Sequence, residues 1–389
     1  MKPLVVVDEN IPGVEELLED IAVIRAVAGR DIDADSLAGA QALLVRSVTP
    51  VNSALVSAAQ LRFIGSATSG TDHVDLQCLQ DRGITFAHAP GSNANSVVEY
   101  VLAAIATVPG KLEQLLAGGS VGIVGFGIIG RLMAARLGGL GIECCAYDPW
   151  LDSSTLHNPS ALEDVLSCDV VTVHAELTHR QPWPSHHLLG ARALSHLKPG
   201  ALLINASRGA VVDNQALLQS LGSREPAYSV VLDVWEGEPE IHQGLLGQVL
   251  LGTPHIAGYS YDGKLLATRM LCEKLAATLG WDLPATPLLD TPPLALASTS
   301  DDAQLIRQAL ESVYDIRADD HALRAATLGS SPGDASAAFD RLRKEYPKRR
   351  ELFGATVTGE GFSESQLGLL SALGCDVKTR GEEPGSEGR

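Results

Sequence analysis

The sequence predicts an α/β fold built of two doubly wound lobes and a smaller α+β unit near the C-terminal end. The 389 residues are enough for two or three domains. Over residues 4–108, short β-branched runs alternate with helical stretches, which is typical of buried parallel strands. A second alternation continues to residue 260, and it begins with a glycine-rich turn between a strand and a helix.

Composition and charge narrow the range of partners. Hydrophobic residues make up 45% of the chain and charged residues 20%, which is typical of globular proteins. The formal net charge of −18 argues against nucleic acid, and no apolar run is long enough to predict a membrane span. The six cysteines show neither a C-x-x-C pair nor zinc-site spacing. We therefore expect a cytoplasmic protein without a metal, in which a few arginines and backbone donors would hold any small anionic ligand.

The first lobe is expected over residues 1–95, with a returning helical segment at 261–283. Its strands are predicted in the segments LVVVDEN, AVIRAV, QALLVRSV, LRFIGSATSG and GITFAHAP. Ligands bind at the carboxyl ends of strands in open α/β sheets, so the turns at 8–10, 46–49 and 66–73 are site candidates. Each of them could also be an ordinary polar turn. We expect this lobe to be flavodoxin-like.

The second lobe, expected over residues 96–260, carries the most informative local pattern. A strand at 121–124 leads into Gly125-x-Gly127-x-x-Gly130, followed by a helix and a strand that ends at Asp148. Such glycines permit a sharp turn and close approach of a pyrophosphate to the helix N-terminus. An acid at the position of Asp148 can accept hydrogen bonds from the adenosine ribose and repel a 2′-phosphate. The pattern predicts a Rossmann-like domain that binds NAD rather than NADP.

Three later strand ends carry the polar residues of a hydride-transfer site. Arg208 in NASRGAVVDN could hold a carboxylate in a bidentate pair, and His255 in TPHIAGYS could remove a hydroxyl proton. Glu238 in WEGEP could accept a hydrogen bond from that imidazole and orient it. Taken singly, each could be structural: a salt-bridge partner, a strand-end histidine or an exposed turn acid. Together, downstream of the dinucleotide turn, they predict a dehydrogenase.

The remaining residues divide into three expected segments. A stretch rich in Pro, Thr and Leu at 284–300 is interpreted as a linker. Residues 301–377 are expected to form the compact α+β unit, and the polar residues 378–389 a disordered tail.

The segments GFGIIG, NASRGAVVDN, LDVWEGEP and TPHIAG, in this order, resemble the D-isomer-specific 2-hydroxyacid dehydrogenases. Within that family, VDEN, LLVRSVT, TSGTDHVD, PGSNANSVVEYV and HIAGYSYDGK are similar to the members that act on 4-phospho-D-erythronate. The resemblance implies its oxidation to 2-oxo-3-hydroxy-4-phosphobutanoate by hydride transfer to NAD, in pyridoxal 5′-phosphate (vitamin B6) biosynthesis. It also implies that the C-terminal unit is a dimerisation domain and that the enzyme is a homodimer.

The resemblance further implies a role for each matched residue. The catalytic residues are Arg208, Glu238 and His255. Substrate contacts fall on Ser47, Thr68 and Tyr259, and the charge of Arg46 makes it an additional candidate ligand of the phosphate. Cofactor contacts fall on Asp148, Ala206, Ser207, Arg208, Asp233 and Gly258. The glycine turn itself adds Gly125, Gly127, Ile128, Ile129 and Gly130 as candidates, and Ala175 is a further candidate at the next strand end.

Some features leave alternatives open. The chain reads HAEL where the family usually has HTPL, so that Ala175 offers no hydroxyl and Glu176 adds an acid. Arg349 and Arg350 could reach a site across a dimer or be solvated surface charges. A related dehydrogenase of another phosphorylated 2-hydroxy acid, such as 3-phosphoglycerate, and a catalytically silent NAD(H)-binding regulator are the competing functions.

Overall fold

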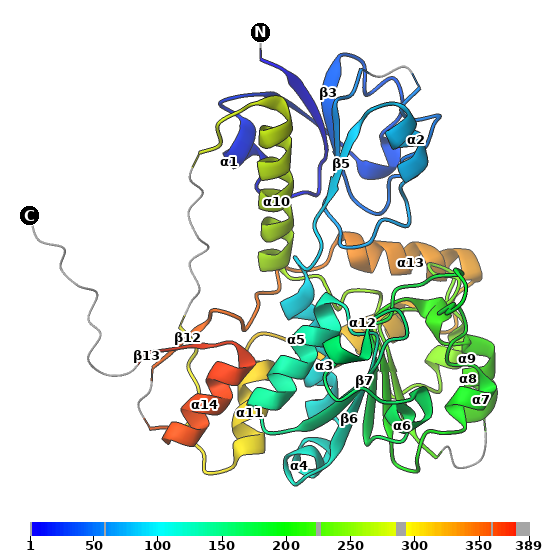
Figure 1. Ribbon diagram of the computed structural model, residues 1–389, viewed down its shortest axis with the longest axis vertical. Coiled ribbons are helices and arrows are strands. Elements are labelled where there is room, and N and C mark those ends of the chain that lie inside the picture. Colours follow the sequence, from blue (N-terminus) through cyan, green and yellow to red (C-terminus); the bar gives the residue numbers. More distant parts are fainter. Residues whose placement is uncertain (1, 58–59, 223–226, 285–292, 359–360, 379–389) are drawn as a thin grey trace, which may run out of the picture. The chain divides into compact units, whose positions relative to one another are not determined.

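The computed structural model describes residues 2–57, 60–222, 227–284, 293–358 and 361–378 (Figure 1). The chain forms two compact units. The first comprises Met1–Asn93 and Ser260–Asp290, and the second comprises Ala94–Tyr259 and Thr291–Arg389.

The first unit contains a parallel sheet with the strand order β2-β1-β3-β4-β5. Its strands match the predicted segments: β1 Leu4–Asp8, β2 Val23–Val27, β3 Ala40–Val45, β4 Phe63–Ser66 and β5 Thr85–His88. The helices are α1 Val14–Leu18, α2 Leu76–Asp81, α10 Tyr261–Leu279 and the 3-10 turn η1 Gly29–Asp31. Alternate residues of the strands feed two apolar cores, and Leu271 and Leu275 of α10 complete one of them.

The second unit contains a six-stranded sheet with the order β11-β10-β9-β8-β6-β7, in which every pair is parallel. The strands are β6 Ser120–Val124, β7 Glu143–Tyr147, β8 Val170–Val173, β9 Leu202–Asn205, β10 Ser229–Leu232 and β11 Leu251–Gly252. The chain runs from β6 outward to β7 and then crosses to β8 on the other side of β6. The switch point between β6 and β8 is where doubly wound sheets bind ligands.

Helices connect these strands and enclose two apolar cores. They are α3 Ala94–Thr107, α4 Lys111–Leu116, α5 Ile128–Gly139, α6 Leu162–Leu166, α7 Ala191–Leu194, α8 Asn214–Leu221 and α9 Gln243–Leu246, with the 3-10 turns η2 Ser153–Thr155 and η3 Gly209–Val211. Among the described residues, no helix is both long and apolar enough to cross a membrane.

The C-terminal segment adds helices α11 Asp302–Glu311, α12 Ile316–Thr327, α13 Pro332–Lys344 and α14 Glu364–Leu373, and the parallel strands β12 Thr356–Thr358 and β13 Asp376–Lys378. It belongs to the same compact unit as the second sheet. Arg324 of α12 donates hydrogen bonds to the carbonyls of Leu246 and Val249, and Asp320 accepts the N–H of Gly252 at 2.7 Å. Helix α12 therefore covers the edge strand β11, which would otherwise expose unpaired backbone.

Two of the expected segments fall partly outside the described residues. Of the expected linker, residues 293–300 contain no helix or strand, and Leu294 donates its N–H to the carbonyl of Thr356 at 2.8 Å. Residues 285–292, and residues 379–389 of the expected tail, lie outside the described part.

Candidate active site

The turn that joins β6 to α5 contains three glycines, and their surroundings differ. Gly125 has a φ of +93°, and a Cβ there would lie 2.4 Å from the nitrogen of Ala175 on the neighbouring strand end. A Cβ on Gly130 would lie 2.2 Å from the carbonyl oxygen of Gly125. At Gly127 a Cβ would meet no atom within 4 Å, so this position faces open space. Two glycines thus make the turn possible, and the third leaves room for a pyrophosphate at the N-terminus of α5.

The next residues in the turn suit a bound dinucleotide as well. Ile128, the first residue of α5, is 53% exposed, which is unusual for a large apolar side chain beside a buried strand end. Ile129 is half-buried and packs against the adjoining core. A cofactor lying over the turn would cover Ile128.

Asp148 fastens the end of β7 to the glycine turn. Its Oδ2 accepts the N–H of Phe126 at 2.9 Å and its Oδ1 accepts the N–H of Trp150 at 3.1 Å. The carboxylate lines a cavity of about 350 Å³ together with Gly125, Gly127 and Ala175. This is the expected place of an adenosine ribose, so the residues present fit NAD.

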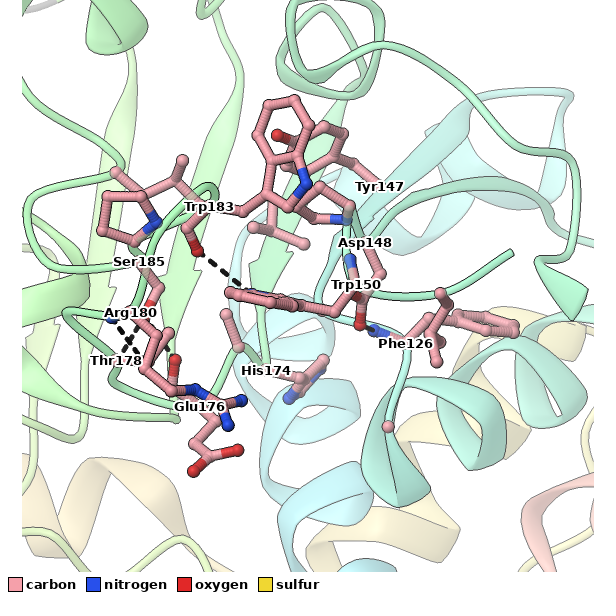
Figure 2. Close-up of a pocket in the computed structure, with 18 of the residues that line it drawn as sticks. Phe126, Tyr147, Asp148, Trp150, His174, Glu176, Thr178, Arg180, Trp183 and Ser185 are labelled. Carbon is pink, nitrogen blue, oxygen red and sulfur yellow. Dashed lines mark hydrogen bonds between the residues drawn. The ribbon is translucent and has the colours of Figure 1, made fainter. Parts of the chain in front are cut away.

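Aromatic and basic side chains form the other wall of this cavity (Figure 2). The guanidinium of Arg180 lies 5.0 Å from the ring centre of Trp150, whose Nε1 donates to the carbonyl of Trp183 at 3.0 Å. His174 also lines the cavity, where burial lowers its pKa to about 4. The His174 imidazole is therefore neutral near pH 7, and one of its nitrogens contacts the Thr172 hydroxyl at 3.0 Å. Glu176 lines the same cavity, so the added acid lies beside the cofactor site.

Arg208 follows β9 in a turn that is fixed from both sides. Asn205 donates from Nδ2 to the carbonyl of Arg208 at 3.0 Å and accepts the N–H of Ser207 at 3.1 Å. A Cβ on Gly209 would lie 2.0 Å from the carbonyl carbon of Trp235, so only glycine allows this turn to pack on the loop that carries Glu238. The turn that carries the half-buried Arg208 is thereby held against that loop. Ala206, two residues before Arg208, is buried.

His255 and Glu238 form a hydrogen-bonded pair. His255 contacts Oε1 of Glu238 through Nδ1, and Glu238 accepts the N–H of Trp235 on Oε2 at 3.2 Å. Burial would raise the pKa of Glu238, but the nearby His255 and Arg343 outweigh it and lower that pKa. Glu238 is therefore ionised near pH 7. Because Nδ1 is engaged, Nε2 is the His255 nitrogen left to exchange a proton with a substrate.

Asp233, at the end of β10, shapes the turn that presents His255. Its carboxylate accepts the Thr253 hydroxyl at 2.7 Å and the backbone N–H groups of Ile256 and Ala257 at 2.8 and 3.0 Å. His255 itself has a φ of +56°, which L-residues rarely adopt, and its N–H donates to the carbonyl of Asp233 at 2.7 Å. Asp233 thus holds the strained turn of His255, and its expected cofactor contact stays a prediction, as does that of Gly258.

The predicted substrate residues of the first unit lie at the carboxyl ends of its strands. Arg46 follows β3 and donates from Nε to the buried carboxylate of Asp8 at 3.0 Å. The Thr68 hydroxyl, after β4, donates to the carbonyl of Gly70 at 2.8 Å, and Ser47 is exposed. Sequence reasoning missed Lys264 of α10, although it lies in the quoted segment HIAGYSYDGK. Burial, and secondarily Arg46, lowers the pKa of Lys264 to about 8, so the first unit places two cationic groups near one another.

The C-terminal segment reaches the residues around His255, which the sequence did not predict. Arg349 is 5% exposed, and it donates from Nη2 to the carbonyls of Ser96 and Ala257 at 2.7 and 3.0 Å. The interpretation of Arg349 as a surface charge or a residue reaching across a dimer is therefore wrong, because its guanidinium is buried within its own chain. Arg343 of α13 lies over the ring of the predicted substrate residue Tyr259.

One group of side chains in the described ranges has donor atoms close enough to hold a metal ion. His186, His187 and Glu236 place such atoms within 4.8 Å of one another. His187 already contacts Glu236 at 2.7 Å through Nε2, and Glu236 also accepts the N–H of Asn214 at 3.3 Å. These hydrogen bonds give His187 and Glu236 a structural role in holding the loop before Glu238. The expected absence of a metal stays a prediction.

Comparison with known proteins gives the chain a family. Residues 105–257 match the model of the D-isomer specific 2-hydroxyacid dehydrogenase NAD-binding domain, and residues 286–374 match a domain of unknown function, DUF3410. An erythronate-4-phosphate dehydrogenase from Cellvibrio japonicus is 44% identical over 95% of this chain and 98% of its own. Another, from Azotobacter vinelandii, is 42% identical over 96% of this chain and 99% of its own.

Solved structures agree with the fold. The TT0316 protein of Thermus thermophilus aligns with a TM-score of 0.59 and 28% identity, covering 71% of this chain and 97% of that one. An NAD-bound 3-phosphoglycerate dehydrogenase from Entamoeba histolytica aligns with a TM-score of 0.60 and 20% identity, covering 72% of this chain and 96% of that one. Together with the full-length relatives, these matches confirm the predicted fold class and cofactor. The chain belongs to the D-isomer specific 2-hydroxyacid dehydrogenase family and is an NAD-dependent dehydrogenase.

Proposed function

We propose that the enzyme oxidises 4-phospho-D-erythronate to 2-oxo-3-hydroxy-4-phosphobutanoate. The choice of substrate rests on one observation. The chain is 44% identical, over nearly the whole of both chains, to a relative named erythronate-4-phosphate dehydrogenase. The hydrogen-bonded pair of His255 and Glu238, beside the turn of Arg208, supports the chemistry.

Arg208, His255 and Glu238 have different roles in the proposed reaction. Arg208 pairs with the carboxylate of the substrate, which fixes the carbon that bears the 2-hydroxyl. His255 takes the proton of that hydroxyl on Nε2, and the ionised Glu238 stabilises the imidazolium that forms. When bound, NAD accepts the hydride from the same carbon. The hydroxyl oxygen thus loses a proton and the carbon loses a hydride, which together convert the alcohol into a ketone.

Charge also favours an anionic substrate at this site. The chain carries a formal net charge of −18, which would repel a phosphorylated acid over most of its surface. Four cations are either predicted site residues or lie near one. Arg208 and Arg343 belong to the second unit, and Arg46 and Lys264 belong to the first. We propose that Ser47, Thr68, Arg46 and Tyr259 contact the substrate.

The biological setting follows from the same proposal. The relatives' enzyme name implies a step in the biosynthesis of pyridoxal 5′-phosphate. We also propose that the enzyme is cytoplasmic and homodimeric, with residues 301–377 forming the dimer contact.

A product assay tests the proposed substrate. Purified enzyme is incubated with NAD and either 4-phospho-D-erythronate or 3-phosphoglycerate, with and without 2-oxoglutarate, and the 2-oxo product is measured by mass spectrometry. Measuring product rather than NADH absorbance detects an enzyme that retains its reduced cofactor. Preferential oxidation of the four-carbon acid is expected. Preference for 3-phosphoglycerate would reject the proposed substrate, and NAD binding without oxidation of either acid would favour the catalytically silent regulator.

A further inference from the structure

The last turn of α13 places a cation on the ring of Tyr259. The guanidinium carbon of Arg343 lies 5.5 Å from the centre of that ring and 6.0 Å from the centre of the Phe339 ring, one helical turn earlier. Tyr346 packs edge-on against Tyr259, with ring centres 5.9 Å apart and an interplanar angle of 80°. Tyr259 is four residues after His255, so the C-terminal segment brings a fixed positive charge close to the catalytic turn.

Arg343 has hydrogen-bonding capacity that the described residues do not use. Its Nε is buried, and no partner for this atom is present in the described part of the chain. A buried donor without a partner is unfavourable, because it has lost its hydrogen bonds to water. The planar guanidinium offers donors in a fork that matches the oxygens of a phosphate or a carboxylate. The Arg343 side chain as a whole is half-buried, so part of it stays open to an anionic ligand.

Two carboxylates show that Arg343 lies near the proposed reacting groups. Glu238 and Asp233 both interact electrostatically with the guanidinium. Glu238 is the partner of His255, and Asp233 shapes the turn on which His255 lies. Arg208, on the turn after β9, is the expected ligand of the substrate carboxylate. A second arginine on the Tyr259 side is therefore suited to the other charged end of a short substrate with two anionic groups.

We propose that Arg343 binds the terminal anionic group of the substrate. Under the proposed function, on which this inference rests, that group is the phosphate of 4-phospho-D-erythronate. The C-terminal segment would then contribute a specificity residue to the site, in addition to supporting the fold. Arg343 would distinguish the phosphorylated acid from D-erythronate, which has the same carbon chain and no phosphate.

The test compares these two substrates in Arg343→Gln and Arg343→Lys. In Arg343→Gln we expect kcat/KM for 4-phospho-D-erythronate to fall about 10- to 100-fold, because a charge-assisted hydrogen bond is lost. For D-erythronate we expect a change smaller than about threefold, so the preference for the phosphorylated acid collapses. Arg343→Lys retains the charge without the fork and should recover part of the loss. Arg341→Gln is the matched control, because Arg341 lies exposed on the same helix.

Three results would overturn the inference. An equal loss on both substrates, with a shifted acid limb in the pH dependence of kcat/KM, would make Arg343 a positioning residue that acts through Glu238. A preference for the phosphorylated acid that survives in both variants would show that other groups bind the phosphate. NADH affinity and thermal melting check folding, and if Arg343→Gln fails to fold, the Arg343→Lys comparison decides. A wild-type enzyme without preference for the phosphorylated acid would instead reject the proposed substrate, and the phosphate assignment with it.

Discussion

A buried carboxyl group in α3 should make the stability of the second unit depend on pH. Glu99 is 3% exposed, and its Oε1 accepts the N–H groups of Leu352 and Phe353 at 2.8 and 3.0 Å. Its Oε2 is buried, and the described residues offer it no hydrogen-bond partner. Burial, and then the charge of Glu351, raises the pKa of Glu99 to about 8, although Arg349 opposes the change. The folded protein therefore keeps this proton near pH 7, whereas an unfolded chain releases it near the ordinary pKa of 4.5.

The sign and size of the effect follow from this difference. Because the folded pKa is raised, the stabilisation is fully present below about pH 4.5 and is lost as the pH rises through about 8. The difference between the ordinary pKa of 4.5 and the folded value of about 8 corresponds to at most about 5 kcal/mol. About 3 kcal/mol of that would be lost between about pH 5.5 and pH 8.5. Glutamine resembles the protonated acid and does not titrate, so Glu99→Gln should lack this loss.

Guanidinium denaturation followed by circular dichroism, at several pH values in that range, measures the difference. We expect wild type and Glu99→Gln to have similar free energies of unfolding at the acid end and the variant to be more stable at the alkaline end. Glu16→Gln, a change at an exposed acid, controls for the loss of one charge. If the difference between wild type and Glu99→Gln stays constant with pH, Glu99 is not the titrating group and the reasoning fails.

Two further predictions concern the site itself. His255→Ala should bind NADH like wild type while kcat falls about 10²- to 10⁴-fold, the usual contribution of general acid–base catalysis, and unchanged turnover would remove His255 from the mechanism. Asp148→Ala should weaken NADH binding about tenfold and reduce the discrimination against NADPH, since it removes the predicted ribose acceptor and the backbone contacts to Phe126 and Trp150. Fluorescence titration with both cofactors measures this, and undiminished selectivity for NADH would contradict the assignment.

Local patterns in the sequence predicted most of the two sheets and the core of the site. Gly125, Gly127 and Gly130 could be interpreted from spacing alone, because a strand, a tight turn and a helix N-terminus are consecutive in the chain. His255 and Glu238 were predicted to pair because the ends of neighbouring parallel strands meet at the same edge of a sheet, and the structure confirms their contact. For the glycines the physical reason lies within one strand-to-helix unit, and for His255 and Glu238 it lies in two neighbouring strand ends.

Residues that reach the site from far along the chain could not be predicted in this way. Arg343 and Arg349 lie in the segment FDRLRKEYPKRRE, where closely spaced charges usually indicate a solvated helix face. Only the packing of α13 and the following residues around Tyr259 and Ala257 shows that these two arginines are turned inward. Tertiary contacts of this kind leave no periodic pattern in a single sequence.

The covering of β11 by α12 and the hydrogen bonds from Arg349 limit how this protein can be divided or recombined. Asp320 and Arg324 bond to the backbone of β11 and the residues just before it, and Arg349 bonds to the carbonyl of Ala257, two residues beyond His255. A chain cut after α10 would therefore keep every residue matched by the dehydrogenase family model and still lose the hydrogen bonds that support β11 and the turn of His255, the proposed general base. Recombining the first 280 or so residues with another C-terminal domain should fail for the same reason, unless the new domain supplies equivalent donors.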